Sequence, residues 1–223
     1  MLLVKSAGRE FLPQWKAEFA RHLPGLEVVW WNDPGADLER ARYVLVWQPE
    51  PGWLARIPNL EVIFSSSAGV EHIVSDPSLP RHLPIVRQQS DELAQTVGEY
   101  VTLAALMLSR DQPRMADAQR RVAWDYFEPP RTALGTRVGL LGLGAMGRRS
   151  AAMLHGIGYR VLGWSRTLRS IEGIACHSGP DGLDAVLAQS HILVSLLPET
   201  AQTRGLIDAR RLRQLPKGAS VIN

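Results

Sequence analysis

The sequence predicts an α/β protein with two domains, each built around a sheet of parallel strands. In the first hundred residues, short strand-like runs alternate with helical segments. After residue 134, further strand-like runs and helices follow in the order β-α-β-β-α-β-α-β. Repeated βα units set strands side by side in parallel and cover them with helices, so both halves are predicted to be α/β layers.

The predicted strands are short apolar runs bounded by Pro, Gly, Asp or other turn residues. In the first half they cover residues 2–4, 26–31, 43–47, 60–65 and 84–86. In the second half they cover residues 138–141, 160–165, 171–176, 191–197 and 219–223. A helix is predicted between the first two strands, because aromatic and apolar side chains recur there at helical spacing from Phe11 to His22.

A long helix is predicted over residues 91–110, with Asp91 as its N-cap. Residues 100–108 are apolar nearly all round, so this half of the helix is expected to be buried between other elements. Such a helix suits a crossing between domains, and we expect domains at residues 1–100 and 101–223. The polar helix that follows leads to aromatic residues at positions 124–127, which could pack on a partner subunit or on their own chain.

A glycine turn organises the second half. Residues 138–147 read V-G-L-L-G-L-G-A-M-G, a strand followed by Gly142, Gly144 and Gly147 in G-x-G-x-x-G spacing and then by a helix. The first glycine permits a tight bend, the second a close approach of a pyrophosphate, and the third close packing of helix on strand. This context predicts a dinucleotide site, with a purely structural turn as the alternative.

The residues at the end of the next strand indicate which dinucleotide is bound. Folds of this kind usually carry an acidic residue there, which binds the ribose hydroxyls of NAD. Here Ser165 lies 23 positions after Gly142 (165 − 142), where that acid is expected, and Arg166 follows it. A guanidinium without a neighbouring carboxylate suits a 2′-phosphate, so we predict NADP, with NAD as a possibility. The alternative is that Arg166 is only a surface residue.

A second junction of this kind follows the strand at residues 60–65. It reads S-S-A-G-V-E-H-I, and its small side chains expose backbone N–H groups where Gly69 opens a short helix, a setting that suits a carboxylate. A tight turn with no ligand is the alternative. Trp47 ends a strand facing the same edge of the sheet, and His72 is read as a packed or surface histidine.

Composition narrows the function classes. The net charge is +3, from 25 Lys and Arg against 22 Asp and Glu, and the short basic clusters read as solvated helix faces, so no nucleic-acid partner is expected. A single cysteine, Cys176, excludes an internal disulfide and a cysteine-based metal site, and no metal is predicted. No signal peptide or membrane-spanning run is found, so a cytoplasmic protein without a membrane partner is expected.

Several motifs in order carry a family resemblance. They are L-V-W at 45–47, A-G-V-E-H-I at 68–73, G-E-Y-V at 98–101, L-G-x-x-V-G-L-L-G-L-G-A-M-G from 134, W-S-R-T at 164–167, L-L-P-E-T-A-Q-T at 196–203 and L-P-K-G-A-S-V-I-N at 215–223. The whole chain thereby resembles the D-isomer-specific 2-hydroxyacid dehydrogenases, nearest to their glyoxylate/hydroxypyruvate reductase A branch. G-L-G-x-M-G also suits β-hydroxyacid dehydrogenases, but those begin with the glycine motif, whereas an α/β domain precedes it here.

The resemblance implies a flavodoxin-like substrate domain and a Rossmann dinucleotide-binding domain, the latter incomplete at its C-terminus. It implies that the N–H groups of Ala68, Gly69 and Val70 hold the carboxylate of a small 2-keto acid in a pocket lined by Trp47. The predicted cofactor-binding residues are Gly142, Gly144, Ala145, Met146, Gly147, Ser165, Arg166 and Thr167, and the resemblance adds Leu197, Pro198 and Thr203. The implied reaction is reduction of the keto acid by hydride from the nicotinamide, in a homodimer when the protein is complete.

The sequence departs from the family at its end. The family's catalytic Arg, Glu and His fall beyond Asn223, so we expect a C-terminally truncated chain with no catalytic residue of its own. None of its histidines matches the catalytic one: His22, His72, His82, His155, His177 and His191. We expect uncovered apolar faces and a chain that is poorly stable, aggregates or is complemented by another copy. The alternative function is a catalytically inactive dinucleotide-binding or interaction protein.

Overall fold

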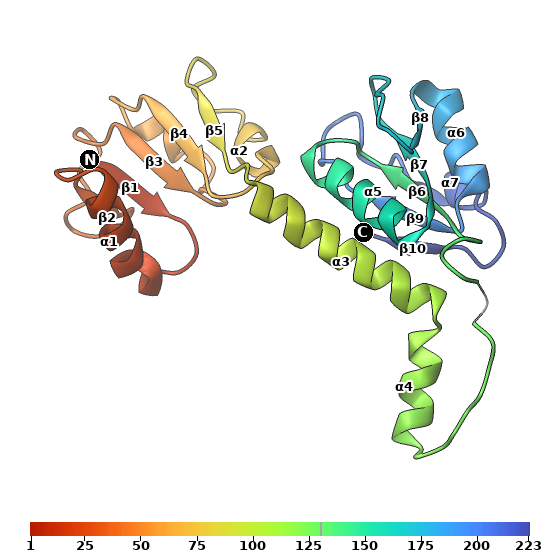
Figure 1. Ribbon diagram of the computed structural model, residues 1–223. Coiled ribbons are helices and arrows are strands. Elements are labelled where there is room, and N and C mark those ends of the chain that lie inside the picture. Colours follow the sequence, from red (N-terminus) through yellow and green to blue (C-terminus); the bar gives the residue numbers. More distant parts are fainter. Residues whose placement is uncertain (130) are drawn as a thin grey trace. The chain divides into compact units, whose positions relative to one another are not determined.

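The computed structural model describes residues 1–129 and 131–223 and divides into two compact units, Met1–Gln89 and Ser90–Asn223 (Figure 1). Each unit has its own parallel sheet and its own buried cores, which confirms the predicted α/β class. The expected boundary between residues 100 and 101 falls inside helix α3 (Asp91–Ser109), all of which lies in the second unit.

In the first unit the strand order is β2-β1-β3-β4-β5, with every pair parallel. This is the order of flavodoxin-like sheets, which confirms the predicted fold. The strands are β1 (Leu2–Lys5), β2 (Val28–Trp30), β3 (Tyr43–Val46), β4 (Val62–Ser65) and β5 (Ile85–Arg87). The helical elements are η1 (Arg9–Phe11), α1 (Leu12–His22), η2 (Leu54–Arg56) and α2 (Glu71–Val74).

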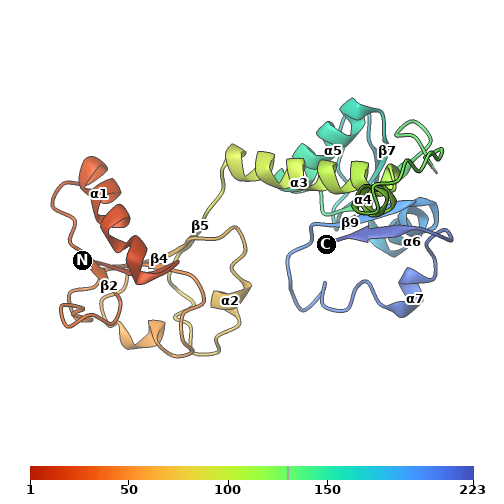
Figure 2. The ribbon, with the colours of Figure 1, turned by 90° about the horizontal axis from the view of Figure 1, so that it is seen from below.

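Alternation along β1 explains how this sheet is buried on both faces. Leu3 packs into the apolar cluster on one face, and its neighbours Leu2 and Val4 pack into the cluster on the other. Successive side chains of a strand point to opposite faces, so an apolar run in β1 requires cover on both. Helices α1 and α2 lie on opposite sides of the sheet (Figure 2).

In the second unit the strand order is β10-β9-β6-β7-β8, again all parallel. The first strand of the unit is central, with the next two on one side and the last two on the other, which is the predicted Rossmann order. The strands are β6 (Arg137–Leu141), β7 (Arg160–Trp164), β8 (Ala175–His177), β9 (Ile192–Ser195) and β10 (Ser220–Ile222). The helices besides α3 are α4 (Gln112–Arg120), α5 (Ala145–Ile157), α6 (Gly179–Gln189) and α7 (Ala209–Leu212).

Two apolar layers sandwich this sheet. Helices α3 and α5 cover one face, where Val101 and Leu154 pack with Leu140, and α6 covers the other face (Figure 2). Gly98 lets α3 approach α5 closely, because a Cβ there would lie 2.6 Å from the sulfur of Met153.

Two expectations about α3 are wrong. The N-cap is Ser90, whose Oγ accepts from the N–H of Leu93 at 3.0 Å, and Asp91 lies in the first turn. The half expected to be buried all round is buried on one face only, since Tyr100 and Leu103 are 60% and 58% exposed. The sequence pattern could not show that the outer face has no covering element within the described chain.

Candidate functional site

The glycine turn joins the end of β6 to the start of α5. Gly142 has a φ of 100°, and a Cβ there would lie 2.8 Å from the carbonyl oxygen of Leu196. A Cβ on Gly147 would overlap the carbonyl oxygen of Gly142. Both positions therefore require glycine for backbone reasons, one for the left-handed bend and one for the close packing of α5 on the turn.

Gly144 faces open space. It is the N-cap residue of α5, no side chain caps this helix end, and nothing lies within 4 Å of the place a Cβ would take. The N–H groups of the first turn, Ala145 to Gly147, have no intrahelical acceptor because of their position. Open space in front of such donors at the positive end of a helix dipole fits a pyrophosphate.

A pocket of about 340 Å³ lies at this end of the sheet. Its walls come from the glycine turn, from the loop after β7 and from the loop after β9. The lining residues are Leu143, Gly144, Trp164, Ser165, Arg166, Thr167, Arg169, Leu197, Pro198, Thr200, Gln202, Thr203 and Leu206. Ligands of open α/β sheets bind outside the carboxyl ends of the strands, and this pocket has that position.

The charge of this pocket is positive. Arg166 and Arg169 both line it, and among the described lining residues there is no carboxylate. The hydroxyl of Ser165 donates to the carbonyl oxygen of Thr167 at 2.8 Å, which helps fix the loop that carries the arginines. Two guanidinium groups without an acidic neighbour attract a phosphate and favour charge-assisted hydrogen bonds to it.

The wall after β9 is held by its threonines. The hydroxyl of Thr203 donates to the carbonyl oxygen of Pro198 at 2.5 Å, and the N–H of Thr200 donates to the Thr203 Oγ at 2.8 Å. These bonds close a turn whose apolar edge includes Leu197. A fixed, partly apolar wall beside the glycine turn suits the flat rings of a dinucleotide.

The structure brings most of the expected cofactor residues together. Those that line the pocket are Gly144, Ser165, Arg166, Thr167, Leu197, Pro198 and Thr203. The others, Gly142, Ala145, Met146 and Gly147, form the adjoining turn and the first turn of α5. The sequence reading missed Leu143, Trp164, Arg169, Thr200, Gln202 and Leu206. The sequence does contain a feature that could have predicted Arg169 in the pocket, because it is a second arginine three residues after Arg166 in the same loop.

The expected substrate residues lie at the carboxyl edge of the first unit's sheet. The register aligns Val46 with Ser65, and Ser65 with Arg87. Trp47 and residues 66–70 therefore follow neighbouring strand ends, and Trp47 is 50% exposed. Helix α2 begins at Glu71, two residues later than expected.

The loop at residues 66–70 is held by serine hydroxyls. Ser67 donates to the carbonyl oxygen of Gly69 at 2.7 Å, and Ser6 donates to Ser66 at 2.6 Å. Within the described chain, the N–H groups of residues 68–70 donate to no protein acceptor. The Arg87 guanidinium reaches the carbonyl oxygen of Ala68 at 3.5 Å. Free N–H groups beside a cation suit a carboxylate. The sequence motif did not predict that Arg87 would lie here.

The histidines give no proton donor for the pocket of the second unit, since none of them is among its described lining residues. Burial, with the nearby cations Arg131 and Arg137, lowers the pKa of His191, which precedes β9 at the opposite end of that strand. In the first unit, burial lowers the pKa of His72, whose Nε2 has no partner in the described chain. The lowered pKa favours the neutral form of both imidazoles.

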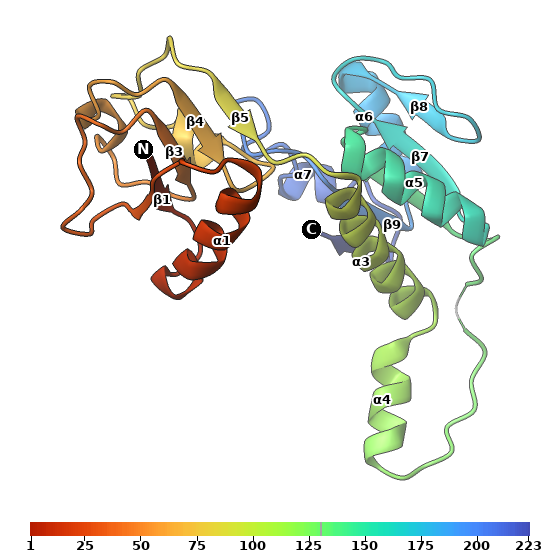
Figure 3. The same ribbon diagram turned by 60° about the vertical axis from the view of Figure 1, so that its left-hand side comes forward.

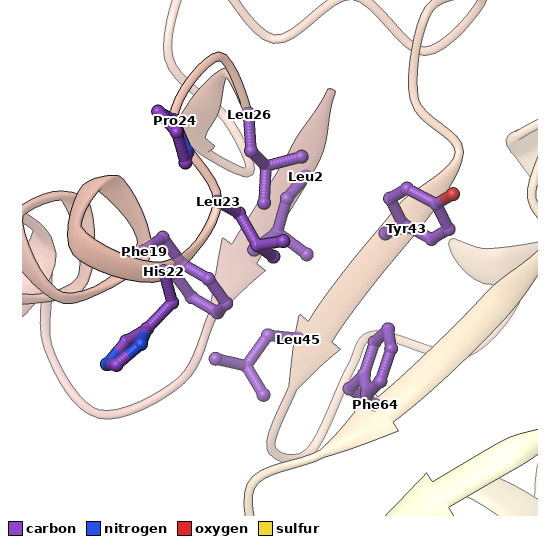
Figure 4. A pocket seen from close by; sticks show the side chains of 9 residues that line it. All are labelled: Leu2, Phe19, His22, Leu23, Pro24, Leu26, Tyr43, Leu45 and Phe64. Carbon is purple, nitrogen blue, oxygen red and sulfur yellow. The ribbon is translucent and has the colours of Figure 1, made fainter.

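A larger pocket, about 680 Å³, lies in the first unit, but its lining is mostly apolar, with His22 and Tyr43 as the polar exceptions (Figure 4). It lies between α1 with its following loop and strands β3 and β4, and Phe19, Leu45 and Phe64 point into it. It has no converging donors of the kind that orient a keto acid, so we do not regard it as the reaction site.

Comparison with known proteins connects the pocket to a family. Residues 102–223 match the family model described as "D-isomer specific 2-hydroxyacid dehydrogenase, NAD binding domain". The chain belongs to this family. Its members are NAD(P)-dependent D-2-hydroxyacid dehydrogenases, and the matched region includes the glycine turn and both pocket loops.

Curated relatives of the family are named glyoxylate/hydroxypyruvate reductase A. The protein of Yersinia enterocolitica is 31% identical over 215 residues, which cover 94% of this chain and 68% of the relative. That of Photorhabdus laumondii is 32% identical over 217 residues, with the same coverage of both chains.

Solved structures of the family agree in fold. A 2-hydroxyacid dehydrogenase of Xanthobacter autotrophicus, in complex with NADPH and MES, is 39% identical with a TM-score of 0.90. The match covers 100% of this chain and 71% of that one. An NADPH-dependent glyoxylate/hydroxypyruvate reductase of Sinorhizobium meliloti, in complex with NADP and sulfate, is 34% identical with a TM-score of 0.88. That match covers 99% of this chain and 71% of the other.

No helix in the described chain is both long and apolar enough to cross a membrane.

Proposed function

We propose that this chain binds NADP(H) in the pocket beside the glycine turn and serves NAD(P)H-dependent reduction of a small 2-keto acid, of the glyoxylate/hydroxypyruvate type, to the D-2-hydroxy acid. The observation that carries the proposal is the pairing of Arg166 and Arg169 in a pocket without a lining carboxylate. A 2′-phosphate distinguishes NADP from NAD, and two guanidiniums favour the cofactor that carries it.

We propose residues 101–223 as the dinucleotide-binding domain and residues 1–100 as the first part of the substrate domain. The pyrophosphate would lie before the first turn of α5, against the N–H groups of Ala145, Met146 and Gly147. The ribose phosphate would meet Arg166 and Arg169, and the wall formed by Leu197, Pro198 and Thr203 would flank the rest of the dinucleotide.

In the first unit, the free N–H groups at Ala68, Gly69 and Val70 would bind the substrate carboxylate, with Trp47 shielding it from water. When bound, NADPH supplies a hydride to the keto carbon. The carbonyl oxygen takes a proton, which leaves NADP⁺ and the 2-hydroxy acid. Names and ligands of the relatives support this substrate and cofactor class. The expected homodimer belongs to the same proposal.

A second candidate function is dinucleotide binding without turnover. The positions of the histidines favour it. None lies among the described lining residues of the cofactor pocket, so this chain offers no imidazole there to supply the proton.

The experiment is NADPH oxidation by the 223-residue chain with glyoxylate or hydroxypyruvate, beside direct titration of NADPH. Turnover together with binding supports the reductase proposal. Binding without turnover supports the second candidate, and failure to bind NADPH contradicts both. Gly147→Ala is the negative control, since it should abolish NADPH binding and, with it, any turnover.

A further inference from the structure

The loop that follows β4 presents a row of free backbone donors, the N–H groups of Ala68, Gly69 and Val70. Strands β3, β4 and β5 lie side by side and are parallel, so this loop lies at the carboxyl edge of the sheet, next to the end of β5 (Figure 3). Helix α2 begins only after these residues and is four residues long. The orientation of the donors must therefore be set by contacts of the loop itself.

The carbonyl oxygens of the same peptide groups are all occupied. The carbonyl of Ser67 accepts from the N–H of Gln88 at 3.2 Å, and that of Ala68 accepts from the Arg87 guanidinium at 3.5 Å. The carbonyl of Gly69 accepts from the hydroxyl of Ser67 at 2.7 Å. In a planar trans peptide the C=O and the N–H point in opposite directions. Each of these bonds therefore turns the N–H of the next residue away from the group that donates.

Ser67 makes the shortest of the three bonds, and a second serine supports it. The Ser67 Oγ lies 3.1 Å from the Oγ of Ser65, which is buried at the end of β4. Ser65 can donate to this oxygen or, at 3.4 Å, to the Gly69 carbonyl, and both choices polarise the same carbonyl. Linked hydrogen bonds strengthen one another, so the N–H on the other side of that peptide, the N–H of Val70, becomes a better donor.

Charged groups of both signs lie beside the loop. The Arg87 guanidinium reaches the carbonyl oxygen of Ala68. The Glu71 carboxylate lies beside Gly69, since a Cβ on that glycine would come within 2.6 Å of its Oε1. Attraction by the guanidinium and repulsion by the carboxylate oppose each other, so the binding of an anion here depends strongly on how the N–H groups are aimed.

We propose that Ser67 is a positioning residue for the carboxylate of the 2-keto acid, because its hydroxyl holds the Gly69 carbonyl and so keeps the N–H of Val70 free for the substrate. The inference rests on the proposed function, which places that carboxylate at residues 68–70. Ser67 acts through this peptide group and not on the reacting atoms. Without the hydroxyl, the peptide must be ordered when the anion binds, and that ordering costs affinity.

Titration of the isotope-labelled 223-residue chain with oxamate, followed by heteronuclear NMR, tests this role without cofactor or turnover. Oxamate has the size and the carboxylate of a small 2-keto acid and is not reduced. In the wild type, the largest amide shifts should be at residues 68–70. Ser67→Ala should weaken oxamate binding about fivefold or more, whereas Ser67→Thr keeps the hydroxyl and should stay within about twofold of wild type.

Ser78→Ala is the matched control. Ser78 lies in the same unit, and its hydroxyl donates to Asp76 in a bond of similar length, 2.6 Å. This variant should lose stability but keep its oxamate affinity within about twofold of wild type. A signal in the ligand-free chain separates positioning from a general loss of structure. The amide proton of Val70 should shift upfield in Ser67→Ala and stay unchanged in Ser78→Ala, because only the first loses the polarised carbonyl.

The outcomes distinguish this inference from the proposed function. If Ser67→Ala binds oxamate as tightly as wild type, or if Ser67→Thr loses as much affinity as Ser67→Ala, the role of the hydroxyl is wrong and the carboxylate site stands. If wild type shows no shift at residues 68–70, both the inference and that site are wrong. Binding of NADPH by the same sample would then show that the cofactor part of the proposed function is unaffected.

Discussion

The carbonyl oxygen of Gly142 occupies the position that a Cβ atom on Gly147 would take. This contact joins the two ends of the glycine turn, because it lets α5 start directly against the strand that precedes it. The open space at Gly144 depends on that arrangement, and so does the proposed cofactor site.

Gly147→Ala should therefore cost about 2 kcal/mol or more of unfolding free energy and abolish measurable NADPH binding, since the added methyl group must displace backbone. Gly156→Ala is the control in the same helix. Nothing lies within 4 Å of its Cβ position, so alanine there should stabilise the chain by up to about 1 kcal/mol. Urea unfolding and cofactor titration measure both effects. Equal behaviour of the two variants would show that the contact is unimportant.

The two arginines of the pocket should set the choice between NADP and NAD. Arg166→Ala should weaken NADPH binding at least about tenfold and leave NADH binding within about twofold, because only NADPH carries the 2′-phosphate. Arg169→Ala should have a smaller effect in the same direction. Arg160→Ala, at the far end of β7, is the control and should change neither. Equal losses for NADPH and NADH would refute the assignment.

Ser109 of α3 and Tyr159, the residue before β7, share a buried hydrogen bond of 2.8 Å. Tyr159→Phe leaves the serine hydroxyl without its partner and should cost about 1–2 kcal/mol of stability. Ser109→Ala should cost a similar amount. The double variant should cost clearly less than the sum, because the bond is lost only once. Strict additivity in urea unfolding would mean that the two hydroxyls do not interact.

The carboxylate of Asp76 should make the stability of the first unit depend on acid pH. The hydroxyl of Ser78 and the N–H groups of Gly52 and Ser78 donate to it, and they lower its pKa in the folded chain. A folded pKa below the unfolded value of about 3.9 stabilises the fold above that pH, and this contribution disappears as pH falls through the folded pKa.

Asp76→Asn should thus be less stable than wild type at neutral pH, and the difference should narrow as the pH is lowered below about 4. Urea unfolding at several pH values, followed by tryptophan fluorescence, measures it. A stability difference that does not change with pH would contradict the role assigned to the ionised carboxylate.

Local pattern was enough to predict both sheets and the glycine turn. Strand residues such as Leu3 and Leu140 are buried wherever the sheet has two covered faces, and Gly142 and Gly147 have backbone requirements visible in their spacing. The place of Arg169 in the pocket depends on the path of a loop, which the sequence does not determine.

The errors at α3 have two physical causes. Ser90 and Asp91 are both good capping residues, and only the extended backbone at Ser90 shows which of them caps the helix. The apolar surface of residues 100–108 predicted burial without distinguishing cover by the same chain from cover by another. Tyr100 and Leu103 are exposed because no element of the described chain packs on their face of the helix.

Titration of the wild-type chain with NADPH and with NADH, followed by calorimetry, tests the central claim most directly. We expect a single saturable site for NADPH, with NADH weaker by at least about tenfold because it lacks the phosphate that Arg166 and Arg169 would bind. Equal affinity for the two cofactors, or no binding of NADPH, would contradict the account.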